Sequence, residues 1–383
     1  MKRLLTAALA ACFVLAIAAF AGETGTIKIG IFQPLTGPAS LMGTDGRDGA
    51  ALAVKQINEA GGVLGRKLEL LSYDDQSSPE VAVKVVTKMI ETDGIDAIIG
   101  SLHSGNIQAA GRRIESSKVV CVGTGTSPVW LQQGWTYLFR SALNTYDNAA
   151  TILNAAGPLN FKNLAILHAQ DEFGQVGMEN MVELAEKHNL KVLGTESFKP
   201  GDTDLTAQMV NLRSLKPDFI YAIATSNELG PLLKQLRNNG YDGYVLGEMS
   251  FGNPETQEVA GKATDKVIFA TSYLMALKDP DEIYEPNIRQ FLVDFQKEYS
   301  RLLQSEVGYR CYDAVNIIAE GVRRAGGTEG TKLRDAIRTI KDFEGLAGTF
   351  DFTDDTGEGL RDGRIYVIMD AKKVPLHEYV KTL

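Results

Sequence analysis

The sequence lacks the motifs that identify the common enzymes built on α/β folds. No GxGxxG follows the first predicted strand, and neither the phosphate-binding motif GxxxxGK[ST] nor the nucleophile motif GxSxG occurs. The four histidines, His103, His168, His188 and His377, are scattered without metal-ligand spacing. We therefore expect a protein that is not an enzyme and that needs neither a metal nor an organic cofactor.

Long apolar runs are also missing, except at the N-terminus. Lys2 and Arg3 precede an uncharged apolar run over 4–20, and Ala19-Phe20-Ala21 has the small-x-small pattern of a cleavage site. This layout is typical of a secretory signal peptide, so we expect cleavage after Ala21 and a periplasmic protein. A membrane anchor is the alternative, and lipoprotein processing at Cys12 is a further one. The apolar run continues past Cys12 to Phe20, which argues against lipid attachment there.

An excess of basic charge is absent as well. Removal of residues 1–21 takes away Lys2 and Arg3 and leaves 37 basic against 48 acidic residues, a net charge of −11. Such a surface is a poor partner for nucleic acid. Two cysteines remain, Cys121 and Cys311; nothing in their spacing brings them together, and their apolar surroundings predict buried free thiols.

Strand and helix patterns alternate along the chain. Strands are predicted at 27–32, 67–73, 97–99 and 119–122, with helices at 45–60, 79–93 and 104–116 between them. The alternation restarts at 164–167 and continues to 266–270, and helices at 284–299, 309–325 and 331–340 precede strand-like pieces at 348–352 and 364–369. This order predicts two α/β units with parallel sheets covered by helices, and the length also suggests two domains.

Two glycine- and hydroxyl-bearing loops follow neighbouring strands of the first unit. One runs from Gly100 through His103 and Ser104, the other from Gly123 through Thr124, Gly125 and Thr126. Ligands bind beyond the carboxyl ends of parallel strands. Ser104 and Thr126 stand at predicted helix N-caps, so the helix ends would offer free N–H groups to a carboxylate. Ordinary capping without a ligand is the alternative.

Several segments, in order, resemble those of type I periplasmic binding proteins of the leucine/isoleucine/valine-binding group. They are 34–38 (PLTGP), 58–67 (NEAGGVLGRK), 73–75 (YDD), 126–128 (TSP), 201–204 (GDTD) and 252–253 (GN). The resemblance covers nearly all of 26–383. It implies two Rossmann-like lobes joined by three crossovers, with 26–143 plus 276–347 as lobe one and 144–275 plus 348–383 as lobe two. It also implies closure on a ligand about the hinge.

The same resemblance assigns a ligand site. The carboxylate-holding residues would be Ser104, Thr124 and Thr126, with His103 and Gly125 in the same loops. Phe173 would cover the ligand, although a place in the core of lobe two is its alternative. The remaining positions fall on Met42, Thr225 and Ser226.

One position departs from the amino-acid binders of this family. The acid that holds a ligand's ammonium aligns with Met249, and Glu248 stands one residue earlier. A shift of one residue turns a side chain to the opposite face of a strand, and a buried unpaired ammonium is costly. Two ligand classes therefore stay open: an amino acid, or an aromatic or aliphatic acid without an amine.

The resemblance implies a monomer that delivers a small carboxylate-bearing solute to the permease of an ABC importer of the branched-chain amino acid type. A sensor that reports the ligand to a separate membrane receptor or kinase is the alternative function.

Overall fold

A computed structural model describes residues 25–272, 279–280, 283, 285–361 and 363–383. The predicted signal peptide, the Cys12 alternative and the predicted helix start at Tyr284 lie outside these residues. Among the residues that are described, no helix is both long and apolar enough to cross a membrane.

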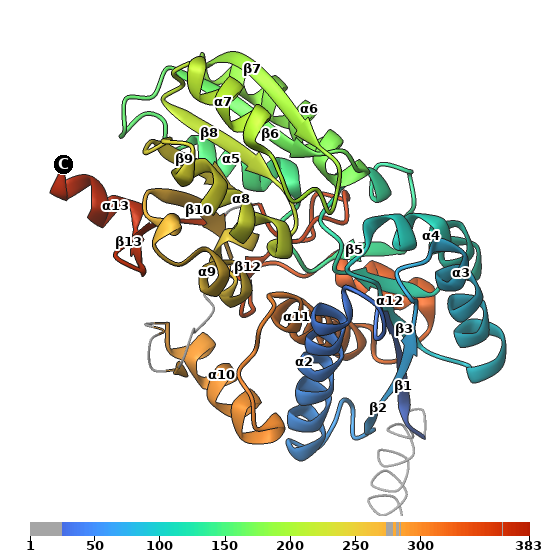
Figure 1. Cartoon of the computed structure of the whole chain (residues 1–383). Helices are drawn as coiled ribbons and strands as arrows, with labels where there is room; N and C mark the ends of the chain where they lie inside the picture. Colours follow the sequence, from blue (N-terminus) through green and yellow to red (C-terminus); the bar gives the residue numbers. More distant parts are fainter. Residues whose placement is uncertain (1–24, 273–278, 281–282, 284, 362) are drawn as a thin grey trace, which may run out of the picture.

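The first sheet is parallel throughout and contains five strands in the order β2-β1-β3-β4-β5. Its central strands are apolar along their whole length because helices cover both faces (Figure 1). The strands are β1 (Ile27–Gln33), β2 (Leu68–Asp74), β3 (Ala97–Ile99), β4 (Val120–Gly123) and β5 (Leu138–Arg140). The helices and turns between them are α2 (Ser40–Glu59), α3 (Pro79–Lys88), η1 (Met89–Asp93), α4 (Ser104–Ser117) and η2 (Pro128–Trp130).

The second sheet has seven strands in the order β14-β13-β10-β9-β8-β6-β7. Strand β13 is antiparallel to both of its neighbours, β10 and β14, and the other pairings are parallel. Its strands are β6 (Asn163–Ala169), β7 (Lys191–Phe198), β8 (Phe219–Ile223), β9 (Tyr244–Gly247), β10 (Val267–Thr271), β13 (Arg364–Met369) and β14 (Lys372–Pro375). Its helices and turns are α5 (Thr145–Leu153), α6 (Glu172–Lys187), α7 (Thr206–Ser214), α8 (Ser226–Asn238), η3 (Met249–Gly252), α9 (Pro254–Ala260), η4 (Gly261–Thr264), α13 (Leu376–Tyr379) and η6 (Val380–Thr382).

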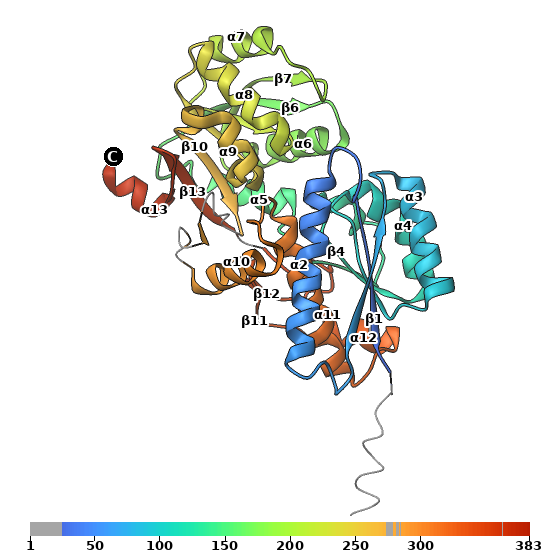
Figure 2. The same ribbon diagram turned by 60° about the horizontal axis from the view of Figure 1, so that its bottom comes forward.

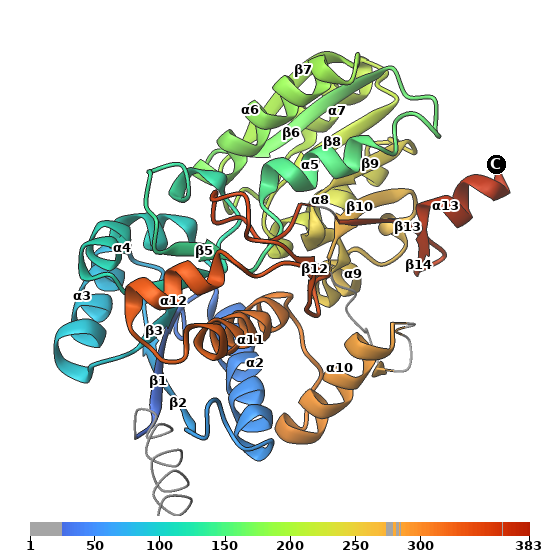
Figure 3. The same ribbon diagram turned by 180° about the vertical axis from the view of Figure 1, so that it is seen from behind.

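The chain returns to the first sheet after β10. There it adds α10 (Pro286–Tyr299), α11 (Val307–Ala325), α12 (Gly330–Ile337) and the short pair β11 (Phe343–Glu344) and β12 (Thr349–Phe350). Figures 2 and 3 show α11 beside α2, although the two helices are far apart in sequence. The predicted fold class, an α/β protein with two mainly parallel sheets and chain crossings between them, is confirmed.

The last chain crossing, from the first sheet to the second, was predicted at 348. In the structure it lies later in the chain. Phe350 stacks on Phe352 with ring centroids 6.0 Å apart, and Phe352 meets Phe139 of β5 at 5.7 Å. Both phenylalanines therefore pack with the first sheet. The lobe limits at the other crossings stay predictions.

Most predicted elements form where their patterns indicated, and the differences concern short elements. Strand β5 and helix α5 lie where no element was predicted, as does β14. The loop after β4 was expected to lead into a helix, but it enters only the three-residue turn η2. Pro128 does take the first position of that turn, as its fixed φ favours.

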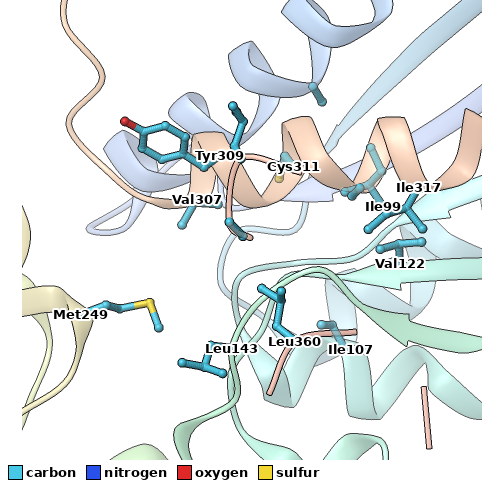
Figure 4. Close-up of a cluster of buried hydrophobic side chains, with 14 of the residues drawn as sticks. Ile99, Ile107, Val122, Leu143, Met249, Val307, Tyr309, Cys311, Ile317 and Leu360 are labelled. Carbon is cyan, nitrogen blue, oxygen red and sulfur yellow. The ribbon is translucent and has the colours of Figure 1, made fainter. Parts of the chain in front are cut away.

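The two cysteines lie on opposite faces of the first sheet. A Cβ placed on Gly100 would contact both Cys121 Sγ at 3.2 Å and Ile107 of α4 at 3.3 Å. Cys311 lies on α11, among the side chains that cover the other face (Figure 4). Both cysteines are buried and free, so the prediction of unpaired thiols is confirmed.

We predict that Gly49→Ala destabilises the fold. A Cβ on Gly49 of α2 would lie 2.1 Å from the carbonyl oxygen of Gly308 in α11. The helices would have to separate, at a cost of about 1–3 kcal/mol, although alanine is favoured over glycine inside helices by ~1 kcal/mol. Urea denaturation measures the loss. Gly157→Ala is the control, because nothing lies within 4 Å of its added Cβ; equal losses in both variants would refute the argument.

Candidate functional site

The loops that follow β3 and β4 lie against each other. A Cβ on Gly125 would lie 2.7 Å from Ser104 Oγ and 3.0 Å from Ser104 Cα. The backbone N–H of Ser127 donates to Ser104 Oγ at 3.1 Å. Gly125 is therefore required by the close approach of the two loops. Ser104, Gly125 and Thr126, predicted from the sequence as parts of one site, are neighbours in the structure.

Only one of the two predicted helix ends is present. Helix α4 starts at Ser104 itself, and its N-cap is His103, whose side chain makes no capping bond. Ser104 is thus the first helical residue, and the prediction that it is the N-cap is wrong. Thr126 precedes Ser127, the N-cap of the short turn η2, so it caps no helix. The Asn106 N–H already donates to the His103 carbonyl at 3.0 Å, so Ser104 and Gly105 are the first-turn residues whose N–H groups precede the first acceptor of the helix.

Thr124 and His103 both use their side chains within the protein. Thr124 is fully buried, and its hydroxyl donates to the Gly100 carbonyl at 3.1 Å. The same hydroxyl accepts from Gln33 Nε2 of β1 at 3.4 Å, and the Thr124 carbonyl accepts from Arg310 Nη1 at 3.1 Å. His103 Nε2 lies 3.1 Å from Ser77 Oγ. Burial lowers the pKa of His103, although the Asp75 carboxylate opposes this, so the imidazole is mainly neutral at pH 7.

The positions predicted from the second unit have structural roles. Thr225 is exposed, and with Glu228 it forms a capping box at the start of α8. Ser226 is buried, and its hydroxyl accepts from Asn253 Nδ2 at 2.7 Å. Phe173 packs against the core of the second sheet, which agrees with its core alternative. Met42 packs against the core cluster that contains the first sheet.

Glu248 and Met249 follow β9 at the carboxyl end of the second sheet. Met249 is buried, and its Sδ accepts from Arg310 Nη2 at 2.7 Å. Figure 4 shows Met249 reaching toward Leu143 and the start of α11. Glu248 is buried too, and burial raises its pKa to about 8, with Arg310 opposing the shift and Glu306 adding to it. The Glu248 carboxyl, at the end of the second sheet, therefore interacts electrostatically with Arg310 and Glu306 at the start of α11.

Sequence reasoning missed Arg310 and Glu306, the two charged residues at this junction. Their side chains are each 5 % exposed and form an ion pair with Nη2 to Oε1 at 3.0 Å. A guanidinium inside the apolar run Val307-Gly308-Tyr309 and Cys311 was the available signal, because a charged side chain on a buried helix face is rare unless it is paired.

Five buried polar atoms near this junction have no partner among the described residues. A native protein rarely leaves such atoms unsatisfied, so each one calls for water or a ligand. They come from the loop after β4, from β8, from the residue that follows β9, and from the start of α11: Ser127 Oγ, Tyr221 Oη, Glu248 Oε1, Glu306 Oε2 and Arg310 Nε. We call these five the orphan cluster.

Two other hollows in the described part of the chain each contain at most one such atom. A cavity of about 590 Å³ is lined by Asn144, Arg338 and Glu358, among others, and one of about 470 Å³ by Gln56 and Asp313. None of the orphan atoms lines either one. Over the described part of the chain, no three His, Cys, Asp or Glu side chains are grouped to hold a metal ion. The candidate site is therefore the junction between the two sheets.

Comparison with known proteins agrees with this geometry. A model of the family described as "Periplasmic binding protein" matches residues 26–373. The chain belongs to this family. It is 29% identical over 351 residues to the leucine-, isoleucine-, valine-, threonine- and alanine-binding protein of Pseudomonas aeruginosa, with 91% of each chain covered.

Two solved structures share the fold at lower identity. One is the branched-chain amino acid transporter substrate-binding protein of Streptococcus pneumoniae in complex with isoleucine, with a TM-score of 0.79, 23% identity, and coverage of 91% of this chain and 97% of that one. The other is a solute-binding protein of an ABC transporter from R. palustris in complex with benzoate, with a TM-score of 0.77, 19% identity, and coverage of 92% and 96%. One fold thus holds ligands with and without an amine, so the fold alone does not decide the ligand class.

The raised pKa of Glu248 predicts a pH-dependent stability. A carboxyl with a pKa of about 8 in the folded protein and an ordinary value of 4.5 when unfolded keeps its proton only in the folded state between these values. Stability therefore falls as pH rises from 5 to 8. Glu248→Gln removes this contribution, so the ligand-free variant should gain more than about 1 kcal/mol relative to wild type over that range.

Urea denaturation at several pH values measures this difference. Burial also raises the pKa of Asp313 to about 7, but this group is present in both proteins and cancels in the comparison. Glu59→Gln, at an exposed position, is the control and should follow wild type. Parallel stability profiles for wild type and Glu248→Gln would show that Glu248 ionises normally.

Proposed function

We propose that the protein captures a small carboxylate-bearing solute outside the cytoplasm and delivers it to the permease of an ABC importer. The observation that carries this proposal is the orphan cluster, whose unsatisfied polar atoms come from the loop after β4, from the second sheet and from the start of α11. A ligand at this place would satisfy atoms of both sheets at once. Two of the relatives named above support the transport role: the Streptococcus pneumoniae protein is a transporter substrate-binding protein, and the R. palustris protein is a solute-binding protein of an ABC transporter.

The first sheet supplies the groups that would bind the carboxylate. Helix α4 offers the N–H groups of Ser104 and Gly105 and the positive end of its dipole. Ser104 Oγ accepts from the Ser127 N–H, and its own hydroxyl proton remains available for donation. Backbone donors and one hydroxyl bind an anion without a permanent positive charge, which suits a protein that must release its ligand.

Closure about the chain crossings would complete the site. The Thr145 N–H, just beyond the first crossing, donates to the Thr126 carbonyl at 2.9 Å, so the crossing is joined directly to the binding loop. Arg310 of α11 contacts Met249, which follows β9 of the second sheet. In an open state these contacts would be exchanged for water, and a ligand that binds both sides would favour closure.

The remaining parts of the proposal follow from the sequence. The signal peptide pattern over 1–21 supports export and a periplasmic location after cleavage at Ala21. In the proposed function the protein binds and releases its ligand without catalysing a reaction. It acts as a monomer, and its macromolecular partner is the permease.

A thermal-shift panel tests the proposal on ligand-stripped protein. A solute that binds only the folded state raises the melting temperature by mass action. We expect stabilisation by at least one small carboxylate, and we expect Ser104→Ala to weaken its binding about tenfold, through loss of one hydrogen bond. Ser116→Ala, at the other end of α4, is the matched control. The proposal fails if no carboxylate stabilises the protein, or if both serine variants bind like wild type.

A further inference from the structure

The guanidinium of Arg310 occupies the junction between the two sheets. It donates to the Thr124 carbonyl at 3.1 Å, to Met249 Sδ at 2.7 Å and to Glu306 Oε1 at 3.0 Å. Thr124 follows β4 of the first sheet, and Met249 follows β9 of the second. The protein thus places its own cation among the groups that would surround a ligand.

The carboxyl groups beside Arg310 leave little negative charge for a second cation. Glu306 is already paired with it. Burial raises the pKa of Glu248 to about 8, so this carboxyl is mostly protonated at pH 7. Glu255 is only partly buried, and burial together with Glu306 raises its pKa as well. The buried part of the junction is therefore close to electrically neutral before any ligand binds.

A ligand ammonium would be poorly placed in this environment. It would have to share Glu306 and Glu248 with Arg310, and like charges repel strongly at short range in a low-dielectric site. Met249 stands where the family resemblance places the acid that holds an ammonium, and its thioether carries no charge. An anion, in contrast, would find the unpaired Nε–H of Arg310 and the first turn of α4.

We propose that Arg310 takes the place of a ligand ammonium, and that the site therefore selects carboxylates that carry no amine beside the carboxylate. This inference rests on the proposed function and adds the ligand class to it: aliphatic or aromatic acids rather than amino acids. Arg310 is then the residue that determines specificity, and the Nε–H donates to the ligand. Protonated Glu248 supplies a second donor from the opposite side.

Isothermal titration calorimetry with matched ligand pairs tests the inference. The pairs are leucine with 4-methylpentanoate and phenylalanine with 3-phenylpropanoate, which differ only in the amine. The carboxylate that binds most tightly in the thermal-shift panel is measured in the same way, together with the compound that differs from it only by the presence or absence of the amine. For the ligand-stripped wild-type protein we expect the amine-free member to bind at least about tenfold more tightly. Tighter binding of the amino acid in every pair that binds would overturn the inference.

Substitution of Arg310 tests whether this cation causes the preference for amine-free acids. Arg310→Met keeps an unbranched apolar stem and removes the guanidinium, but it leaves Glu306 buried and unpaired, which can prevent folding. The double variant Arg310→Met/Glu306→Gln removes both charges and avoids this problem. We expect the preference for amine-free acids to fall at least about tenfold in the double variant, and to reverse in Arg310→Met if it folds.

The matched control is Arg324→Met on the same helix, where the arginine is partly exposed and pairs with Glu320. This variant should keep the wild-type preference. If the double variant also keeps it, Arg310 does not set specificity, although the proposed function stands. If no carboxylate of the pairs or the panel binds at all, the proposed function fails, and the inference fails with it.

Discussion

A buried arginine at the end of β5 holds the binding loop and the chain crossings in one arrangement. Arg140 is fully buried; it donates to the carbonyls of Gly125 and Ser127, and its Nε donates to Glu358 at 2.9 Å. Its guanidinium also lies 4.2 Å from the centre of the Trp130 ring. Burial lowers the pKa of Arg140, and Glu358 counteracts this. Because the desolvated cation needs all these acceptors, the loop cannot move independently of the segment that carries Glu358.

The parts of this fold that the sequence predicted are those with a repeating pattern. Ala97–Ile99 was predicted with the bounds that the structure has, because an apolar run between turn residues indicates a buried strand. Strand β5 is equally short, but it was missed because Arg140 interrupts its apolar run. Its place at the sheet edge depends on pairing with β4 and on the contact with Glu358, which are long-range interactions that no local pattern contains.

The candidate site divides in the same way. The loops around Ser104 and Gly125 could be predicted, because they follow neighbouring parallel strands and such strand ends meet in space. The charge of Arg310 within an apolar helical run was visible in the sequence, but its contacts could not be predicted, since Met249 lies 61 residues earlier and the carbonyl of Thr124 lies 186 residues earlier. The family resemblance also predicted Thr225 as a ligand contact, but its hydroxyl donates to Glu228 in the helix that Thr225 caps. Local hydrogen bonds of this kind compete with any ligand for the same side chain.

The two ends of the proposed site therefore depend on different kinds of group. The carboxylate end uses backbone N–H groups and Ser104, which lie where α4 follows β3. These groups bind any carboxylate, so they do not distinguish between ligands that differ elsewhere. The other end uses side chains of α11 and of the turn after β9, and a single substitution there changes the charge. A buried cation at Arg310 and a thioether at Met249 reverse the electrostatic preference of this end while the scaffold stays the same. The fold and the carboxylate loop are compatible both with amino acids and with acids that carry no amine. The charges that meet between the sheets therefore determine the ligand class.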